Sequence, residues 1–189
     1  MEIINDKYIF FGSFPQTNEN TKEPIKWRII KNEDNILTLI TDSILYNNDF
    51  DYTSSNYKTS KIRKYILEEF IPFAFTKQEQ KLILKTQLDD IDEKIIDKVY
   101  LPSYDDLKNF TKEELMRKVT PYARNNKTSM YTLKDKVLNG NGWYWTRTPY
   151  KPDWYKNHVY YVTYFGDILE RTGSGRDIGI VLMTKIKID

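Results

Sequence analysis

His158 is the one histidine in this chain of 189 residues, and it is the side chain best suited to proton transfer near neutral pH. A single imidazole excludes metal sites that need several histidines. The spacing of residues around it assembles no set of nucleophile, base and acid. Ser174, between two glycines, lacks the sequence motif of hydrolase nucleophiles. An enzyme that works around His158 without cysteine is therefore the third hypothesis for this sequence.

Aromatic residues near His158 indicate binding rather than catalysis. Trp154 and Tyr155 lie in the segment 150–158, and Tyr160 follows it. Large, rigid rings offer much contact area and lose little rotamer freedom on binding. The leading hypothesis is a non-catalytic recognition module that binds a protein or a glycan through an aromatic and basic loop surface. The predicted ligand-binding residues are Arg147, Trp154, Tyr155, His158, Tyr160, Arg171 and Arg176.

Arg147 is the predicted binding residue with two competing interpretations. Trp143, Trp145 and Arg147 alternate along one predicted strand, so their side chains share one face of it. The tryptophans either pack in the core, with Arg147 as a structural hydrogen-bonding centre, or the three side chains contact the ligand. The sequence supports both interpretations equally.

The segment 117–151 supports a second hypothesis, which is nucleic-acid binding. It holds eight lysines and arginines and one acid, Asp135, whereas the whole chain has a net charge of only +2. Tyrosines and tryptophans are interleaved with these cations, an arrangement that can neutralise phosphates and stack on bases. No known nucleic-acid motif accompanies the segment. The second hypothesis is thus a binder of nucleic acid, or of a nucleic-acid enzyme, encoded by a phage or another mobile element.

The composition excludes several kinds of metal site. The absence of cysteine excludes disulfides, thiolate zinc sites, iron–sulfur clusters and cysteine nucleophiles. The densest group of acids lies between residues 89 and 93 and could offer oxygen ligands to calcium, but a solvated loop explains it better. We predict no metal and no cofactor.

These residues must be positioned by a mixture of strands and helices. The spacing of Ile62, Tyr65, Ile66 and Phe70 predicts a helix over 61–70 that ends before Pro72 and packs on the sheet carrying Trp27 and Trp145. Runs rich in apolar, β-branched and aromatic residues predict strands at 8–11, 25–30, 36–40, 95–101, 142–147, 158–164, 168–171 and 178–188.

Three further helices are predicted from their first turns. In each, a hydroxyl residue precedes by three positions an acid that can satisfy the free amides of the turn. The pairs are Thr76 with Glu79, Ser103 with Asp106, and Thr111 with Glu114. Strands, then a helical block, then strands again favour one α+β domain over residues 1–189.

Several short motifs follow one another along the chain: FGSFPQ (11–16), PIKWR (24–28), SKIRKYI (60–66), AFT (74–76), DKVYLPS (97–103), TPYA (120–123) and WYWTRTP (143–149). Their order resembles that of an uncharacterised bacterial domain family related to C-type-lectin-like folds and the formylglycine-generating enzymes. The resemblance implies a twisted, mostly antiparallel sheet with flanking helices and long loops that bind ligands.

Two departures limit what this resemblance implies. The family usually closes with Gly-Val-Arg-Pro-Ala, whereas residues 179–183 are Gly-Ile-Val-Leu-Met and lack the arginine and the proline. The copper and oxygen chemistry of the formylglycine-generating enzymes needs cysteines that this chain does not have. The triplets of calcium-dependent sugar sites are missing from the sequence as well.

The start of the sequence and its apolar stretches bear on location. Residues 1–6 lack the basic start and long apolar run of a secretory signal, and no apolar stretch is long enough to cross a bilayer. We therefore expect a cytoplasmic protein without membrane contact, and a phage or mobile-element origin is compatible with this expectation.

Overall fold

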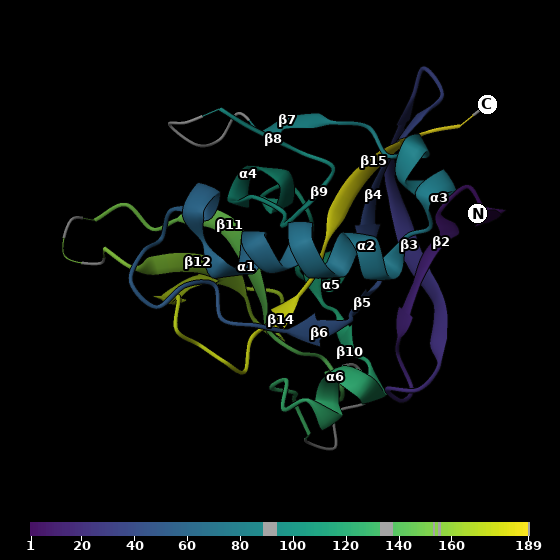
Figure 1. Cartoon of the computed structure of the whole chain (residues 1–189). Helices are drawn as coiled ribbons and strands as arrows, with labels where there is room; N and C mark the ends of the chain where they lie inside the picture. The colour runs from purple at the N-terminus through teal and green to yellow at the C-terminus, as the bar shows by residue number, and fades with distance from the viewer. Residues whose placement is uncertain (89–93, 133–137, 153, 155, 189) are drawn as a thin grey trace.

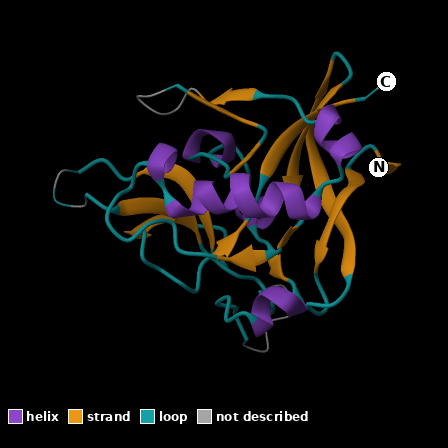
Figure 2. Cartoon of the chain, viewed as in Figure 1, coloured by secondary structure: helices purple, strands orange, loops and turns teal. Residues whose placement is uncertain are grey.

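Most strands of the computed structural model are divided between two larger sheets (Figures 1 and 2). The structure describes residues 1–88, 94–132, 138–152, 154 and 156–188. The six-stranded sheet contains, in spatial order, β1 (Glu2–Asn5), β2 (Tyr8–Pro15), β3 (Lys22–Glu33), β4 (Ile36–Thr41), β15 (Met183–Lys187) and β9 (Val99–Tyr100). The five-stranded sheet contains β13 (Ile168–Thr172), β12 (His158–Val162), β11 (Tyr144–Pro149), β14 (Gly179–Ile180) and β6 (Tyr46–Asn47).

Two short strand pairs complete the β-structure. β10 (Lys118–Val119) runs parallel to β5 (Ser43–Ile44), and β7 (Thr86–Leu88) runs antiparallel to β8 (Ile95–Asp97). β11 and β14 are also parallel, while the remaining pairs of the two larger sheets are antiparallel. The chain is therefore a mixture of α and β structure with mostly antiparallel sheets, as the sequence predicted.

The prediction of one sheet was wrong, and the C-terminal run shows why. The predicted strand 178–188 is divided into β14, in the five-stranded sheet, and β15, in the six-stranded sheet. Val181 and Leu182 between them are fully buried, so the run stays apolar while it changes sheets. A backbone hydrogen bond fixes the chain at the point where it passes from one sheet to the other. The Thr41 amide donates it to the Leu182 carbonyl at 2.9 Å.

The predicted helix over 61–70 is confirmed in part, because it continues past its expected end. After the 3-10 turn η1 (Tyr57–Thr59), it consists of α1 (Lys61–Tyr65), the π-helical turn η2 (Ile66–Phe70) and α2 (Ile71–Ala74). The Ile71 amide donates to the Ile66 carbonyl across the wider π-turn. Pro72 then lies in the first turn of α2, where a missing amide hydrogen is tolerated, so it does not end the helix.

This helical run packs across both larger sheets (Figure 1). Phe75, directly after α2, has its ring centroid 6.4 Å from that of Trp27 in the six-stranded sheet. Near the other end, the Ile62 amide donates to the Phe50 carbonyl at 3.1 Å, and the Phe50 ring lies 6.0 Å from that of Trp145. The two tryptophans thus belong to different sheets, and the helix joins them.

All three helix starts predicted from hydroxyl and acid pairs are confirmed. α3 (Lys77–Leu82), α4 (Tyr104–Leu107) and α5 (Lys112–Leu115) each begin with a reciprocal capping box. A further helix, α6 (Pro121–Asn125), was not predicted, although Thr120 caps it and a proline occupies its first position.

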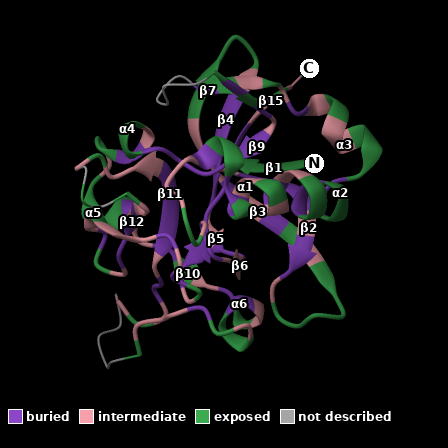
Figure 3. Cartoon of the chain, turned by 60° about the vertical axis from the view of Figure 1, so that its left-hand side comes forward, coloured by how far each residue is buried: buried purple, intermediate pink, exposed green. Residues whose placement is uncertain are grey.

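Buried apolar residues form one core cluster between these elements, and Figure 3 shows them along β4 and β11. β12 and β13 pair as neighbouring antiparallel strands, and Gly166 in the turn between them has a φ of 79°. No helix in the described part of the chain combines the length and the apolar character that crossing a membrane requires.

Candidate functional site

β12 carries two of the predicted binding residues on one face. Val159 and Tyr161 are buried, whereas His158 and Tyr160 are partly exposed, because successive side chains of a strand point to opposite faces. His158 and Tyr160 lie near Trp154 in sequence, and the Tyr160 ring packs against Tyr104 of α4 and against Tyr150, directly after β11. We call the set Tyr104, Tyr150, Trp154, His158 and Tyr160 the aromatic surface.

Three tyrosine rings of the aromatic surface are packed together. The Tyr160 ring centroid lies 5.1 Å from that of Tyr104 and 5.4 Å from that of Tyr150, with the second pair nearly perpendicular at 86°. The Tyr150 amide donates to the His158 carbonyl at 2.9 Å, and the Tyr104 amide donates to Thr148 Oγ1 at 2.8 Å. The backbones that carry the rings are therefore fixed to one another.

Trp154 is the most exposed large apolar side chain in the described ranges, with 83% of its surface accessible. It lies between β11 and β12, in the loop that the sequence predicted as a contact surface. The next residue, Tyr155, is also a predicted ligand-binding residue and lies outside the described residues. When a ligand covers an exposed indole, apolar surface is removed from water, which favours binding.

The phenol of Tyr160 stays neutral at physiological pH. Burial raises its pKa above the usual value, and the neighbouring hydroxyls of Tyr150 and Tyr104 add to the effect. A neutral phenol can donate and accept one hydrogen bond at the edge of an apolar ring. The aromatic surface therefore combines ring faces with hydroxyl groups.

Two predicted binding residues, Arg171 and Arg176, are not part of the aromatic surface. Arg171 is paired in register with Val159, so it lies on the opposite sheet face from His158 and Tyr160. Its guanidinium carbon is 5.2 Å from the centroid of the Trp143 ring, and it forms an ion pair with Asp177 at 3.4 Å.

Arg176 lies in the connection between β13 and β14. Its side chain is 78% exposed, and its guanidinium carbon lies 5.6 Å from the centroid of the Tyr52 ring. The buried carboxylate of Asp49 is 3.9 Å away. This position is separate from the ring cluster formed by Tyr104, Tyr150 and Tyr160.

Arg147 is a buried hydrogen-bonding centre, only 4% exposed. Its Nη1 donates to the Leu101 carbonyl at 2.6 Å and to Asp106 Oδ2 at 2.8 Å, and its guanidinium carbon lies 5.3 Å from the centroid of the Tyr100 ring. The same Asp106 carboxylate accepts the Ser103 amide of the α4 capping box. These contacts favour the structural interpretation of Arg147.

Two arginines of the basic segment 117–151 are buried in the protein interior. Besides Arg147, Arg117 is buried and donates to the Thr41 carbonyl at 3.1 Å. Burial lowers the pKa of Arg117, because it penalises the charged form. Arg124 and Lys127 are exposed, whereas Lys134 and Lys136 lie outside the described residues.

The acids considered as calcium ligands, residues 89–93, also lie outside the described residues. Among the residues that the structure describes, no group of three histidine, aspartate or glutamate side chains is arranged to hold a metal ion.

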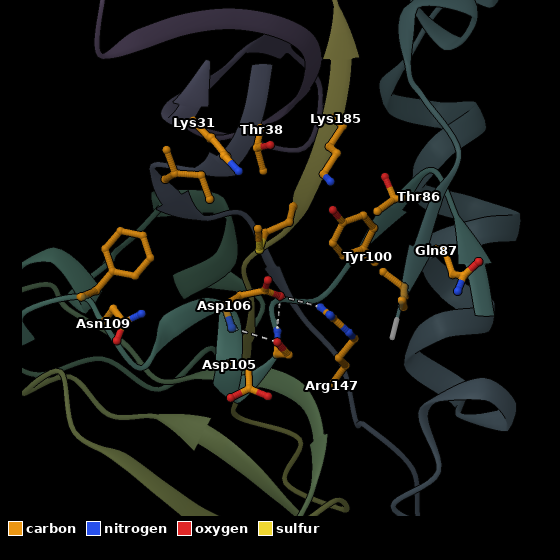
Figure 4. A pocket seen from close by; sticks show the side chains of 15 residues that line it. Lys31, Thr38, Thr86, Gln87, Tyr100, Asp105, Asp106, Asn109, Arg147 and Lys185 are labelled. Atoms are coloured by element: carbon orange, nitrogen blue, oxygen red, sulfur yellow. Dashed lines mark hydrogen bonds and ion pairs between the residues drawn. The ribbon is translucent and has the colours of Figure 1, made fainter. Parts of the chain in front are cut away.

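A polar cleft of about 630 Å³ lies beside α4 (Figure 4). Lys31, Thr38 and Lys185 come from three adjacent strands of the six-stranded sheet. Thr86 and Gln87 come from β7, while α4 contributes Asp105 and Asp106.

The sequence did not predict this cleft, because its lining comes from segments far apart in the chain. Arg147 is the one lining residue that the sequence singled out as a ligand contact. The α4 capping box supplies Asp106 but does not reveal what lies opposite it. Tyr104, the first residue of α4, was missed in the same way, since its ring partners Tyr150 and Tyr160 follow more than forty residues later.

Comparison with known proteins assigns the family. The model of the domain of unknown function DUF6273 matches residues 33–180, which is more than half of the chain. No curated protein and no solved structure matches the chain significantly. The chain therefore belongs to the DUF6273 family, in agreement with the predicted membership of an uncharacterised domain family.

Proposed function

We propose that this chain is a non-catalytic recognition module that binds a protein or a glycan through the aromatic surface. The observation that carries the proposal is the exposed Trp154 indole in the loop that leads into β12. β12 itself carries Tyr160, whose ring packs against two other tyrosine rings. Binding sites of proteins are enriched in such rings, because each covers a large area at a low cost in rotamer entropy.

The order of the ring cluster supports binding without rearrangement. Tyr160 is held between Tyr104 and Tyr150, and both neighbours are fixed by backbone hydrogen bonds. A surface that is already ordered loses less conformational entropy when a ligand arrives. Phenol hydroxyls around the rings would give such a ligand directional hydrogen bonds.

The finer fold assignment is part of this proposal. We place the DUF6273 chain among the C-type-lectin-like folds, and the mostly antiparallel sheets with long connections support this placement. A binding loop between β11 and β12 agrees with the long ligand-binding loops that the resemblance implies. A cytoplasmic location is likewise proposed from the sequence.

The proposal is tested by screening two defined sets of probes. The labelled chain is applied to an oligosaccharide array and to a displayed peptide library, each in parallel with the Trp154→Ala variant. We expect one set to give ligands that the wild-type chain retains and the variant loses. Ligands that both chains retain equally would place recognition on another surface and overturn the proposal.

Leu169→Ala is the matched control for this screen. Leu169 is 48% exposed and is paired in register with Tyr161, so it lies on the opposite sheet face from Tyr160. Its truncation also removes an exposed apolar side chain from the five-stranded sheet. Probes that need the aromatic surface should bind this variant as they bind the wild-type chain.

A further inference from the structure

The floor of the polar cleft carries a row of three side chains set by strand register. Lys31 of β3 and Lys185 of β15 are both paired with Thr38 of the intervening β4. Paired residues of neighbouring strands share a face, and neighbouring strands lie about 4.8 Å apart, so the lysine backbones are about 10 Å apart. Figure 4 shows both ammonium groups in the cleft on either side of Thr38.

The positive charge of this row is not balanced within the floor. Lys185 is partly buried and forms no ion pair with any residue that the structure describes. Lys31 pairs with Glu33 at 2.9 Å, but both side chains of that pair are well exposed, so water screens the attraction. Two ammonium groups on one face repel each other unless an anion lies between them.

Acids on the opposite wall do not supply this anion. Asp106 is engaged by Arg147 and by the Ser103 amide. Asp105 forms an ion pair with Lys108 at 2.7 Å, and both side chains are well exposed, so water also screens the charge of Asp105. Neither carboxylate of this wall therefore forms an ion pair with Lys31 or Lys185 among the described residues.

Two hydroxyl groups in the cleft lack partners within the described part of the chain. Thr86 Oγ1 is buried without a hydrogen bond. Thr38, only 8% exposed at the centre of the floor, also makes no side-chain hydrogen bond to a described residue. Buried hydroxyls are normally satisfied, so both groups are available to a ligand or to ordered water.

We propose that the cleft floor binds an oxyanion group of a small ligand between Lys31 and Lys185. The ammonium groups would neutralise its charge, while the hydroxyls of Thr38 and Thr86 would donate hydrogen bonds to its oxygens. A phosphate and a carboxylate share this chemistry. The cleft volume of about 630 Å³ leaves room for the rest of a ligand beside the anionic group.

The walls indicate that this remainder is polar. Asn109 lines the cleft with an amide group, and Phe110 adds ring surface beside it. A hollow of about 400 Å³ extends the cleft past Lys31 and Lys185 towards Lys85, Glu33 and Asp34. This site is distinct from the aromatic surface, although α4 contributes residues to both.

Calorimetric titration at low salt tests the proposal with three probes. Inorganic phosphate represents a phosphate group and glucuronic acid a carboxylate, while glucose is the neutral match of glucuronic acid. We expect saturable binding of at least one anion and none of glucose. The anion that binds identifies the source of the oxyanion, and absence of saturable binding of both up to about 10 mM would overturn the site.

Two lysine variants distinguish a specific anion site from general electrostatic attraction to a basic surface. Lys185→Gln should weaken anion binding at least tenfold. Lys187→Gln, which removes an exposed lysine from the same strand, should change it less than twofold. Equal losses in the two variants would contradict the site, because they would show attraction by overall charge only.

Thr38→Val gives a second, independent readout. The exchange keeps the shape of the side chain but removes the hydroxyl, so we expect weaker anion binding with an unchanged or higher Tm. Full anion affinity in this variant would remove Thr38 from the site. The Trp154→Ala variant should bind the anion normally, so failure of this site leaves the proposed function of the aromatic surface untouched.

Discussion

Arg147 and Asp106 join β11 to α4 through a bond of 2.8 Å between Nη1 and Oδ2, and the same carboxylate caps the helix. This bond helps to position the helix that carries Tyr104 on the aromatic surface and Asp105 in the cleft. A single ion pair thus supports both proposed binding regions.

Asp106→Ala should destabilise the fold by about 3 kcal/mol, because it leaves the buried Arg147 guanidinium without its carboxylate and removes the α4 cap. Asp105→Ala, which breaks only the exposed pair with Lys108, should cost less than about 1 kcal/mol. Urea unfolding of both variants measures the difference. Equal costs would show that the Arg147 pair does not anchor α4.

Asp42 should make stability depend on acid pH. Burial raises its pKa, but the hydrogen bond and charge of Arg28, with Lys26 at 3.2 Å, outweigh this effect and lower the pKa below its usual value of 3.8. A lowered folded-state pKa stabilises the fold above the unfolded pKa, and this contribution is lost as pH falls through the folded value. The stability gap between the wild-type chain and Asp42→Asn should therefore close below pH 3.8. A gap that stays constant in acid would refute this coupling.

Tyr144 predicts a matching effect at alkaline pH. Its buried hydroxyl donates to the Leu115 carbonyl at 2.9 Å, and burial raises its pKa to about 12. Because the folded pKa exceeds the usual 10, the stabilisation is complete below pH 10 and is lost as pH rises towards 12.

The Tyr144→Phe variant tests this effect. At neutral pH it should lose about 1 to 3 kcal/mol, since the buried Leu115 carbonyl loses its donor. Between pH 10 and pH 12 its stability should fall less steeply than that of the wild-type chain. Equal slopes, measured by chemical unfolding at a series of pH values, would show that Tyr144 does not titrate with unfolding.

Local chemistry allowed the helix starts to be predicted from sequence. Ser103 and Asp106 cap α4 through groups only three positions apart, so no knowledge of the remaining fold was needed. The continuation of the helix past Pro72 was missed because it depends on the π-turn, which the periodicity of apolar residues does not reveal.

Features that depend on contacts between distant segments of the chain, such as sheet order and the cleft, could not be predicted from the sequence. The run stays apolar from Ile178 to Met183, across the change of sheet, so its pattern did not reveal the change of partner at Leu182. His158 and Tyr160 were found from their residue types and their closeness in sequence to Trp154, and the structure places them on one face of β12. The row of Lys31, Thr38 and Lys185 was missed because it depends on the register of three strands.

The most direct test of recognition through the aromatic surface is a titration of one selected ligand against three sets of variants at low and physiological salt. Trp154→Ala and Tyr160→Ala should each weaken binding by about 2 kcal/mol, or roughly 30-fold, with little dependence on salt. Leu169→Ala and the combined exchange of Lys127, Lys134 and Lys136 for glutamate should leave affinity nearly unchanged. Binding that survives both aromatic exchanges, disappears with the lysine exchanges and falls steeply with salt would contradict the account and favour the nucleic-acid hypothesis.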